Sequence, residues 1–204
     1  MEFFESWVEL GIAMGALLAG ILIFILPVLI EKKKRVGLLL VPKDPIDYAI
    51  HSKVHEQLTE LRTRTDAARS QVVQFHNGGE FLDGISMKKM SLTYESLANG
   101  ISSELNTKQD ILLSLCLDGL KYIKENNPNI IMVNQMHDSW CKSSLTDSGV
   151  IAWSGLPLRS GGSVTGYIMC QWCSWNKTDG IDEEKTARYL EEARNIIEVQ
   201  LNQQ

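Results

Sequence analysis

The sequence is short of cysteine and of positive charge, and each shortage narrows the classes of function. Its 204 residues include only four cysteines, Cys116, Cys141, Cys170 and Cys173. An even count permits disulfide bonds, but four in a chain of this length do not make a disulfide scaffold. The formal net charge is −5 and the pI is about 5.4. Because a nucleic-acid-binding domain normally has a basic face, we predict that the protein does not bind nucleic acid.

The sequence also lacks the short motifs that mark common enzyme sites. It contains no P-loop, no dinucleotide-binding fingerprint and no HExxH motif. Ser86, Ser91 and the cysteines stand in no nucleophile elbow or related signature. We therefore predict a protein without catalytic residues, which is not an enzyme.

Two residue spacings are compatible with metal binding, and a structural interpretation is favoured for both. His51 and His55 are four apart on a predicted helix, but no third ligand lies nearby in the sequence, so a solvated helix face is expected. Cys170 and Cys173 form one CxxC at the end of a predicted strand, where residues three apart point to opposite faces. A second CxxC is absent. We predict no metal site and no cofactor.

A long apolar run begins near the N-terminus. No charged residue occurs from Leu10 to Ile30. A helix of about 20 residues spans the ~30 Å hydrocarbon core of a bilayer. A cleaved signal peptide is the alternative, but it needs basic residues before the run, and only acidic ones precede it here. The prediction is an uncleaved transmembrane anchor over 1–31, a basic juxtamembrane linker over 32–44 and a soluble domain over 45–204.

Flanking charges and small residues predict the orientation and association of this anchor. A basic cluster directly follows the run and no Lys or Arg precedes it: Lys32, Lys33, Lys34 and Arg35. Positive flanks stay on the cytoplasmic side, so the N-terminus is expected outside and the domain in the cytoplasm. Gly11, Gly15 and Ala19 lie four apart, a spacing that lets two membrane helices approach closely. Such residues are also common in membrane helices, so the pattern permits self-association without requiring it.

Residues 45–204 alternate between helical and strand patterns. A leading helix is predicted over 45–69 and a closing helix over 182–201, with another helix over 108–124. Strands are predicted over 71–75, 85–94, 129–133, 150–158 and 163–172, the last two joined by a turn at 159–162. Alternation in the second strand places Met90, Leu92 and Tyr94 on one face. The apolar stripe of the leading helix fits a coiled-coil seam or packing on its own domain, and the second is favoured. The fold class is α+β, with a central antiparallel sheet flanked by helices.

This order of elements resembles the GAF and PAS sensor folds over 45–204. The likeness rests on topology and on the closing pattern Gly166-Tyr167-Ile168-Met169-x-x-Trp172, followed by a loop and Ile181-Asp182-Glu183-Glu184. On a chain with one N-terminal span, the same pattern is similar to the T-even phage holins. The segment FHNGG (75–79) is similar to a feature of phage-encoded GAF-like proteins. The holin resemblance implies a periplasmic domain, the reverse of what the basic cluster predicts.

The stretch QFHNGGEFLDGISMKKMSLTYE (74–95) concentrates unusual polar residues. Asn77-Gly78 is a strong hairpin signal and predicts the turn. His76 can bond the loop backbone or face a pocket, and a structural role is favoured because no companion is specified. A lysine of the Lys88-Lys89 pair can meet an anionic ligand, although such pairs are more often solvated. The GAF resemblance implies that this stretch lies on a pocket wall, with candidate ligand-binding residues His76, Asn77, Lys89, Tyr94 and Glu95.

Together these features predict a non-enzymatic, single-pass protein of the inner (cell) membrane. Its GAF/PAS-like domain is expected to sense a small ligand or bind a protein partner, and the chain is expected to form a homo-oligomer in the lipid bilayer. The alternative is a phage holin-type lysis protein, in which the span oligomerises and the globular domain regulates it.

Overall fold

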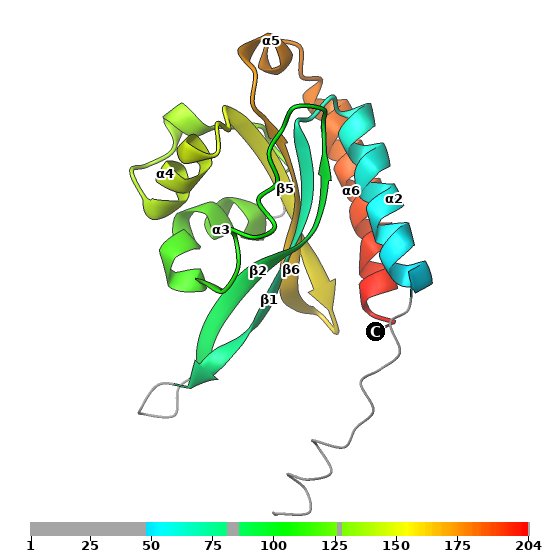
Figure 1. Cartoon of the computed structure of the whole chain (residues 1–204), viewed down its shortest axis with the longest axis vertical. Helices are drawn as coiled ribbons and strands as arrows, with labels where there is room; N and C mark the ends of the chain where they lie inside the picture. Colours follow the sequence, from blue (N-terminus) through cyan, green and yellow to red (C-terminus); the bar gives the residue numbers. More distant parts are fainter. Residues whose placement is uncertain (1–47, 81–85, 126–127, 204) are drawn as a thin grey trace, which may run out of the picture. The chain divides into compact units, whose positions relative to one another are not determined.

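The computed structural model describes residues 48–80, 86–125 and 128–203, which form an α+β domain (Figure 1). The predicted anchor (1–31) and linker (32–44) lie outside the described residues, and so do Gly11, Gly15 and Ala19. Among the helices that the structure describes, none has both the length and the apolar character to cross a membrane.

A six-stranded sheet forms the middle layer of the domain, with the strand order β3-β2-β1-β6-β5-β4. All neighbouring strands are antiparallel, which confirms the predicted sheet type. The strands are β1 (Arg69–Glu80), β2 (Ser86–Leu97), β3 (Ile111–Leu112), β4 (Ile131–Met132), β5 (Ala152–Ser160) and β6 (Ser163–Trp172). Gly161 and Gly162, with φ of 55° and 83°, make the tight turn between β5 and β6 where the sequence predicts one.

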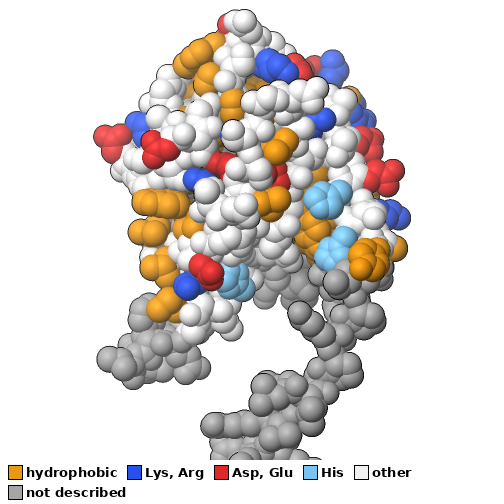
Figure 2. Space-filling view, viewed as in Figure 1, with side chains coloured by type: hydrophobic (Ala, Val, Ile, Leu, Met, Phe, Trp, Pro, Cys, Tyr) orange, Lys and Arg blue, Asp and Glu red, His pale blue; other side chains and the backbone are white. Residues whose placement is uncertain are grey.

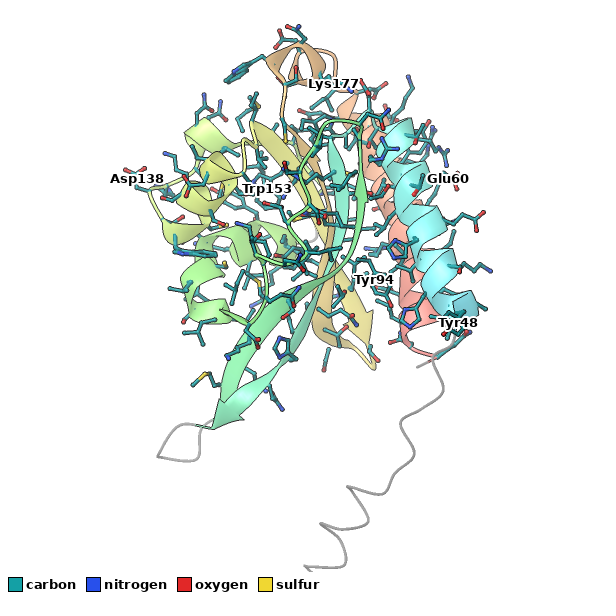
Figure 3. All side chains as sticks on the ribbon, in the orientation of Figure 1. Tyr48, Glu60, Tyr94, Asp138, Trp153 and Lys177 are labelled. Atoms are coloured by element: carbon teal, nitrogen blue, oxygen red, sulfur yellow. The ribbon has the colours of Figure 1, made fainter. Side chains whose placement is uncertain are left out.

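Helices cover both faces of the sheet (Figure 1). One face carries α2 (Tyr48–Arg64) and α6 (Glu183–Leu201). The other carries the 3₁₀ turn η1 (Leu113–Cys116), α3 (Leu117–Lys124) and α4 (Trp140–Asp147). The remaining short elements are η2 (Val133–Gln135) and α5 (Trp175–Thr178). Figure 3 labels Tyr94 on the α2 side of the sheet and Trp153 on the α3 and α4 side, and these two residues belong to separate hydrophobic clusters.

The leading helix packs on its own domain through its apolar stripe. Ile50, Val54, Leu58 and Leu61 are all buried. The helix ends at Arg64, earlier than the predicted residue 69, because Asp66 adopts a left-handed conformation with φ of 51°. The Ala67 N–H then bonds the Arg62 carbonyl at 3.1 Å, which closes a Schellman motif. This termination frees Arg69 to begin β1.

The predicted helix over 108–124 is wrong in its first half. Residues 111–112 form β3 and residues 113–116 form η1, so that only Leu117–Lys124 is α-helical. Asp110 has φ of 56°, which interrupts a helix, and its N–H bonds the Ser91 hydroxyl of β2 at 2.9 Å. The Gln109 amide donates to the Leu92 carbonyl at 2.7 Å. Hydrogen bonds to β2 therefore override the helical pattern of this segment.

Two features of the β1–β2 hairpin also differ from expectation. Asn77-Gly78 is not the turn, because β1 continues through Asn77, which pairs with Lys88, as far as Glu80. The connection falls in residues 81–85, outside the described residues. Thr93 is an extra residue in β2, since Val72 pairs with Tyr94 while Val73 pairs with Leu92. This β-bulge turns Tyr94 away from the face that Met90 and Leu92 share, contrary to the predicted alternation.

Candidate functional site

Two adjoining cavities lie between the sheet and the elements η1, α3 and α4 that cover one of its faces. Their volumes are about 70 Å³ and about 50 Å³, and we refer to the pair as the Tyr167 cavity. Both are lined by the same central residues, Cys116, Cys141, Leu145, Tyr167 and Met169. The sheet supplies an apolar wall that includes Val73, Met90 and Leu92. The site therefore joins five strands of the sheet, β1, β2, β3, β5 and β6, to η1, α3 and α4.

Tyr167 projects from β6 into this layer and is 8% exposed. Its hydroxyl donates a weak hydrogen bond to Met90 Sδ at 3.6 Å. Burial raises the pKa of the phenol well above its usual range, so the side chain stays a neutral donor. A neutral hydroxyl inside an apolar wall can orient a small molecule without demanding a counter-charge.

Lys108 and Glu104 form the polar side of the cavity. Lys108 Nζ donates to the Ser144 hydroxyl of α4 and lies 3.9 Å from Glu104 Oε1. The ammonium also lies 5.9 Å from the centre of the Trp140 ring, within the range of a cation–π contact. Lys108 therefore ties the loop before β3 to the first turns of α4.

A buried hydrogen-bond network stands behind this polar side. The Gln71 side-chain amide donates to Glu95 Oε1 and to Glu104 Oε2, at 2.8 Å each. Glu95 also accepts from the Ser103 hydroxyl at 2.7 Å, and Glu104 accepts from the Ser148 hydroxyl. Across the residues that the structure describes, every buried side-chain nitrogen and oxygen has a hydrogen-bond partner. The carboxylates are therefore held by the fold itself, which is the condition for keeping such groups inside a protein.

Arg69 brings a buried guanidinium to the same layer. It is 5% exposed and donates to Gln171 Oε1 at 3.2 Å and to Cys173 Sγ at 3.3 Å. Its other hydrogen bonds reach the carbonyls of Ser102 and Ser148. Arg69 thus connects the end of the sheet to the two loops that contain Ser102 and Ser148, which carry polar residues of the network.

Three of the predicted site residues lie along the β1–β2 hairpin, outside the Tyr167 cavity. His76 Nε2 shares a hydrogen bond of 2.9 Å with the Ser91 hydroxyl and lies 4.0 Å from Asp110 Oδ1. Lys89 Nζ is 3.6 Å from the same carboxylate oxygen. Asn77 accepts a hydrogen bond from Lys88 Nζ at 2.8 Å. The structure thus brings His76 and Lys89 together around Asp110, at the exposed end of the hairpin.

Tyr94 and Glu95 point to opposite faces of the sheet. The Tyr94 hydroxyl shares a hydrogen bond of 2.7 Å with His51 Nδ1, and its ring meets the edge of the His55 ring at 5.4 Å between centroids. Figure 2 shows histidine side chains at the surface on the α2 side. Glu95 is the predicted residue nearest the Tyr167 cavity, since it bonds Gln71, which lines the wall. The sequence-based set is therefore divided among three places.

The residues that form the cavity were largely missed from the sequence. Cys116, Cys141, Glu104 and Lys108 stand in no recognisable motif. Tyr167 and Met169 belong to the closing pattern that carries the GAF and PAS resemblance, which was the available signal. Gln71 and Glu95 pair across β1 and β2, a relation that only the strand register reveals.

The cysteines divide by location. Cys170 and Cys173 pack into different hydrophobic clusters on opposite faces of the sheet, as the strand geometry predicts. Cys116 and Cys141 come together in the Tyr167 cavity, and all four are free thiols. In the described part of the chain, no group of three or more His, Cys, Asp or Glu side chains is arranged to hold a metal ion.

Comparison with known proteins identifies the fold. No family model and no curated protein matches the sequence. A far-red cyanobacteriochrome photoreceptor is similar with a TM-score of 0.55 and 12% identity, over 90% of this chain and 98% of that one. The phycocyanobilin-bound GAF domain of a cyanobacterial phytochrome gives a TM-score of 0.55 and 14% identity, over 87% and 93% of the two chains. GAF3 from Slr1393 of Synechocystis sp. PCC6803 gives a TM-score of 0.51 and 14% identity, over 76% and 94%.

These likenesses show a GAF-like fold and confirm that part of the predicted resemblance. At such low sequence identity, these similarities are evidence for the fold and for nothing further. The holin resemblance and the membrane span stay predictions.

Proposed function

We propose that this GAF-like domain is a non-enzymatic sensor module that binds a small molecule in the Tyr167 cavity. The observation that carries the proposal is an apolar cavity against the sheet, with Lys108 and Glu104 at one side. Mostly apolar walls with a few fixed polar groups are the usual composition of a ligand site. The structural neighbours support a sensing role, since they include a far-red cyanobacteriochrome photoreceptor and the phycocyanobilin-bound GAF domain of a cyanobacterial phytochrome.

The size of the cavity sets the class of ligand. Drug-sized ligands occupy pockets of roughly 300–1,000 Å³. The two parts of the Tyr167 cavity measure about 70 Å³ and about 50 Å³, so the residues present do not fit a tetrapyrrole. The ligand that fits is a small, largely apolar molecule. A single polar group on it would meet Lys108 or the Tyr167 hydroxyl.

Small aromatic probes test this proposal. Benzene, phenol and benzoate are added to the full chain in detergent, and the thermal unfolding midpoint is followed by tryptophan fluorescence. A ligand that binds only the folded state raises that midpoint with concentration. Leu145 lines both parts of the cavity. The larger side chain of Leu145→Trp should therefore occupy the cavity and abolish the shift of the unfolding midpoint.

Val164→Trp introduces the same side chain at a partly exposed position of β6 outside the cavity and should preserve the shift. Equal shifts in both variants, or no shift with any probe, would remove the cavity as the binding site.

Membrane attachment is the second part of the proposal. The uncharged run from Leu10 to Ile30, followed by Lys32–Arg35, supports a single anchor with the domain in the cytoplasm. Self-association through Gly11, Gly15 and Ala19 is supported by their spacing. In intact cells, a tag at the C-terminus should then be protected from an impermeant reagent. Gly15→Ile should weaken crosslinking between copies, whereas Ile12→Val should leave it unchanged.

The same architecture is compatible with a holin-type function. The accessibility of the C-terminal tag in intact cells distinguishes this lysis function from the sensor function. A C-terminal tag labelled in intact cells, together with abrupt loss of membrane potential on expression, would favour the lysis protein. Protection of the tag and a stable membrane potential would favour the sensor. Recovery of the full chain as a water-soluble monomer without detergent would remove both.

A further inference from the structure

Two thiols from separate elements meet in the wall of the Tyr167 cavity. Cys116 ends η1 and Cys141 is the second residue of α4. Both line both parts of the cavity, and the two thiols lie close enough for each to shift the pKa of the other. Cys116 is 4% exposed, whereas Cys141 is half-buried. The half-buried thiol is thus the accessible member of the pair.

The backbone of α3 lies directly against the sulfur of Cys141. Gly119 of α3 has no Cβ, and Cys141 Sγ lies 2.6 Å from the place where one would stand. The Gly119 N–H, in the first turn of α3, is one of the groups that lower the pKa of the Cys141 thiol. Amides at that end of a helix have no partner within the helix, so they are available for an anionic acceptor.

The two thiols are chemically unequal. The neighbouring Cys116 thiol lowers the pKa of Cys141 and the positive charge of Lys108 acts in the same direction, while burial opposes both. The Cys141 thiol and burial together raise the pKa of Cys116. Cys141 is therefore the member of the pair that ionises more readily, and the thiolate is the nucleophilic form.

We propose that Cys141 and Cys116 form a peroxide-responsive dithiol, with Cys141 as the reacting thiol and Cys116 as the resolving thiol. The Cys141 thiolate attacks one oxygen of a hydroperoxide, breaks the O–O bond and becomes a sulfenic acid. The other oxygen leaves with its electron pair and is protonated to water or an alcohol. Cys116 then attacks the Cys141 sulfur, forming the S–S bond and expelling the hydroxyl group, which takes the Cys116 proton and leaves as water. The two thiols together supply the two electrons that reduce the peroxide.

The other two cysteines lack this arrangement. Cys170 is fully buried, and burial raises its pKa to about 12. Burial also raises the pKa of Cys173, which lies beside Arg69. They therefore serve as internal references for reactivity within the same molecule.

A disulfide would join η1 directly to α4 across the wall of the cavity. These two elements already pack against each other, so the bond adds a covalent link within one face of the domain. The proposal goes beyond ligand sensing and does not depend on it, because the chemistry requires only the thiols, their surroundings and a peroxide.

The test uses the full chain in detergent, reduced and then exposed to hydrogen peroxide. Free thiols are alkylated at intervals, and the products are mapped by peptide mass spectrometry. We expect loss of two thiols and a crosslinked peptide pair containing Cys116 and Cys141, with reversal by dithiothreitol. This mapping is made on the unaltered protein and so does not depend on whether any variant folds.

Variants then separate the roles of the two thiols. Cys116→Ser should stop the reaction at a sulfenic acid on Cys141 that a dimedone-type reagent traps. Cys141→Ser should slow thiol loss to the rate of Cys170, and Cys170→Ser should react as the unaltered protein does. The proposal is overturned if the crosslink joins other cysteines, if Cys141 is oxidised without joining Cys116, or if Cys141 reacts no faster than Cys170.

Discussion

The side-chain amide of Gln71 donates a hydrogen bond of 2.8 Å to Glu104 Oε2, and the same nitrogen donates to Glu95. Gln71, Glu95 and Glu104 are 1%, 7% and 6% exposed, so little bulk water can reach the carboxylates to replace this donor. One amide group thereby donates a hydrogen bond to each of two acidic side chains behind the candidate ligand site.

Gln71→Leu should destabilise the domain, because it leaves two buried carboxylates without a shared donor. The expected loss is about 1–3 kcal/mol in the free energy of unfolding, measured by urea titration of the full chain in detergent. Gln74→Leu changes a half-buried glutamine of the same strand and should cost no more than about 0.5 kcal/mol. Equal losses in the two variants would show that the network contributes little.

Asp66 provides a test of the motif that ends α2. Its φ of 51° suits glycine better than any residue with a Cβ. Both Asp66→Gly and Asp66→Ala remove the ion pair with Lys177, so that contribution cancels between them. Asp66→Ala should be less stable than Asp66→Gly by about 1 kcal/mol, measured by thermal unfolding. The reverse order would contradict the left-handed conformation.

Gly166 sets the closeness of β1 and β6. It pairs with Gln74, and a Cβ at this position would collide with the backbone carbonyl of Val73. Because the obstacle is backbone, Gly166→Ala should cost about 1–3 kcal/mol in the free energy of unfolding. Thr165→Ala, at the preceding exposed position, should be nearly neutral. A stable Gly166→Ala protein would mean that the strands separate without penalty.

Asp182 should make the stability of α6 depend on pH. The hydrogen bond from the Lys185 N–H at 3.0 Å is the main cause that lowers the pKa of the Asp182 carboxyl. A depressed folded pKa stabilises the protein above the ordinary Asp value of about 3.9, and this contribution is lost as the pH falls through the folded value.

Asp182→Ala should therefore lower the unfolding midpoint at neutral pH and remove part of its decline in acid. Asp179→Ala, at an exposed aspartate before the helix, is the comparison. Identical pH profiles for these two variants would exclude the capping explanation.

The parts of the fold that the sequence predicts well are those with a local cause. The two glycines after Ser160 force a tight turn, and β6 occupies the predicted residues 163–172. The closing helix begins after Asp182, whose side chain caps it, and buries Leu190, Ala193 and Ile197 at helical spacing. In each case the determining residues lie within or next to the element itself.

The missed parts have causes distant in the sequence. The α4 helix buries no residue completely, so it has no apolar stripe to reveal it. The segment around Asp110 is set by hydrogen bonds to β2 rather than by its own pattern. The cavity could not be predicted because its walls come from five strands, η1, α3 and α4. Its two thiols are separated along the chain by α3, β4 and η2.

The bulge at Thr93 decides which layer of the protein receives an acidic group. If the same residues of β2 ran without a bulge, Tyr94 would share the face of Leu92, so its phenol would point toward the Tyr167 cavity and the Glu95 carboxylate toward the apolar stripe of α2. The extra residue thus decides which side of the sheet receives the acid, although the composition of the strand would be the same in either arrangement. Deletion of Thr93 keeps the pairs Val72–Tyr94 and Val73–Leu92 and should leave each of these side chains in its present layer, which makes Thr93 a position where β2 can lose a residue without changing its register.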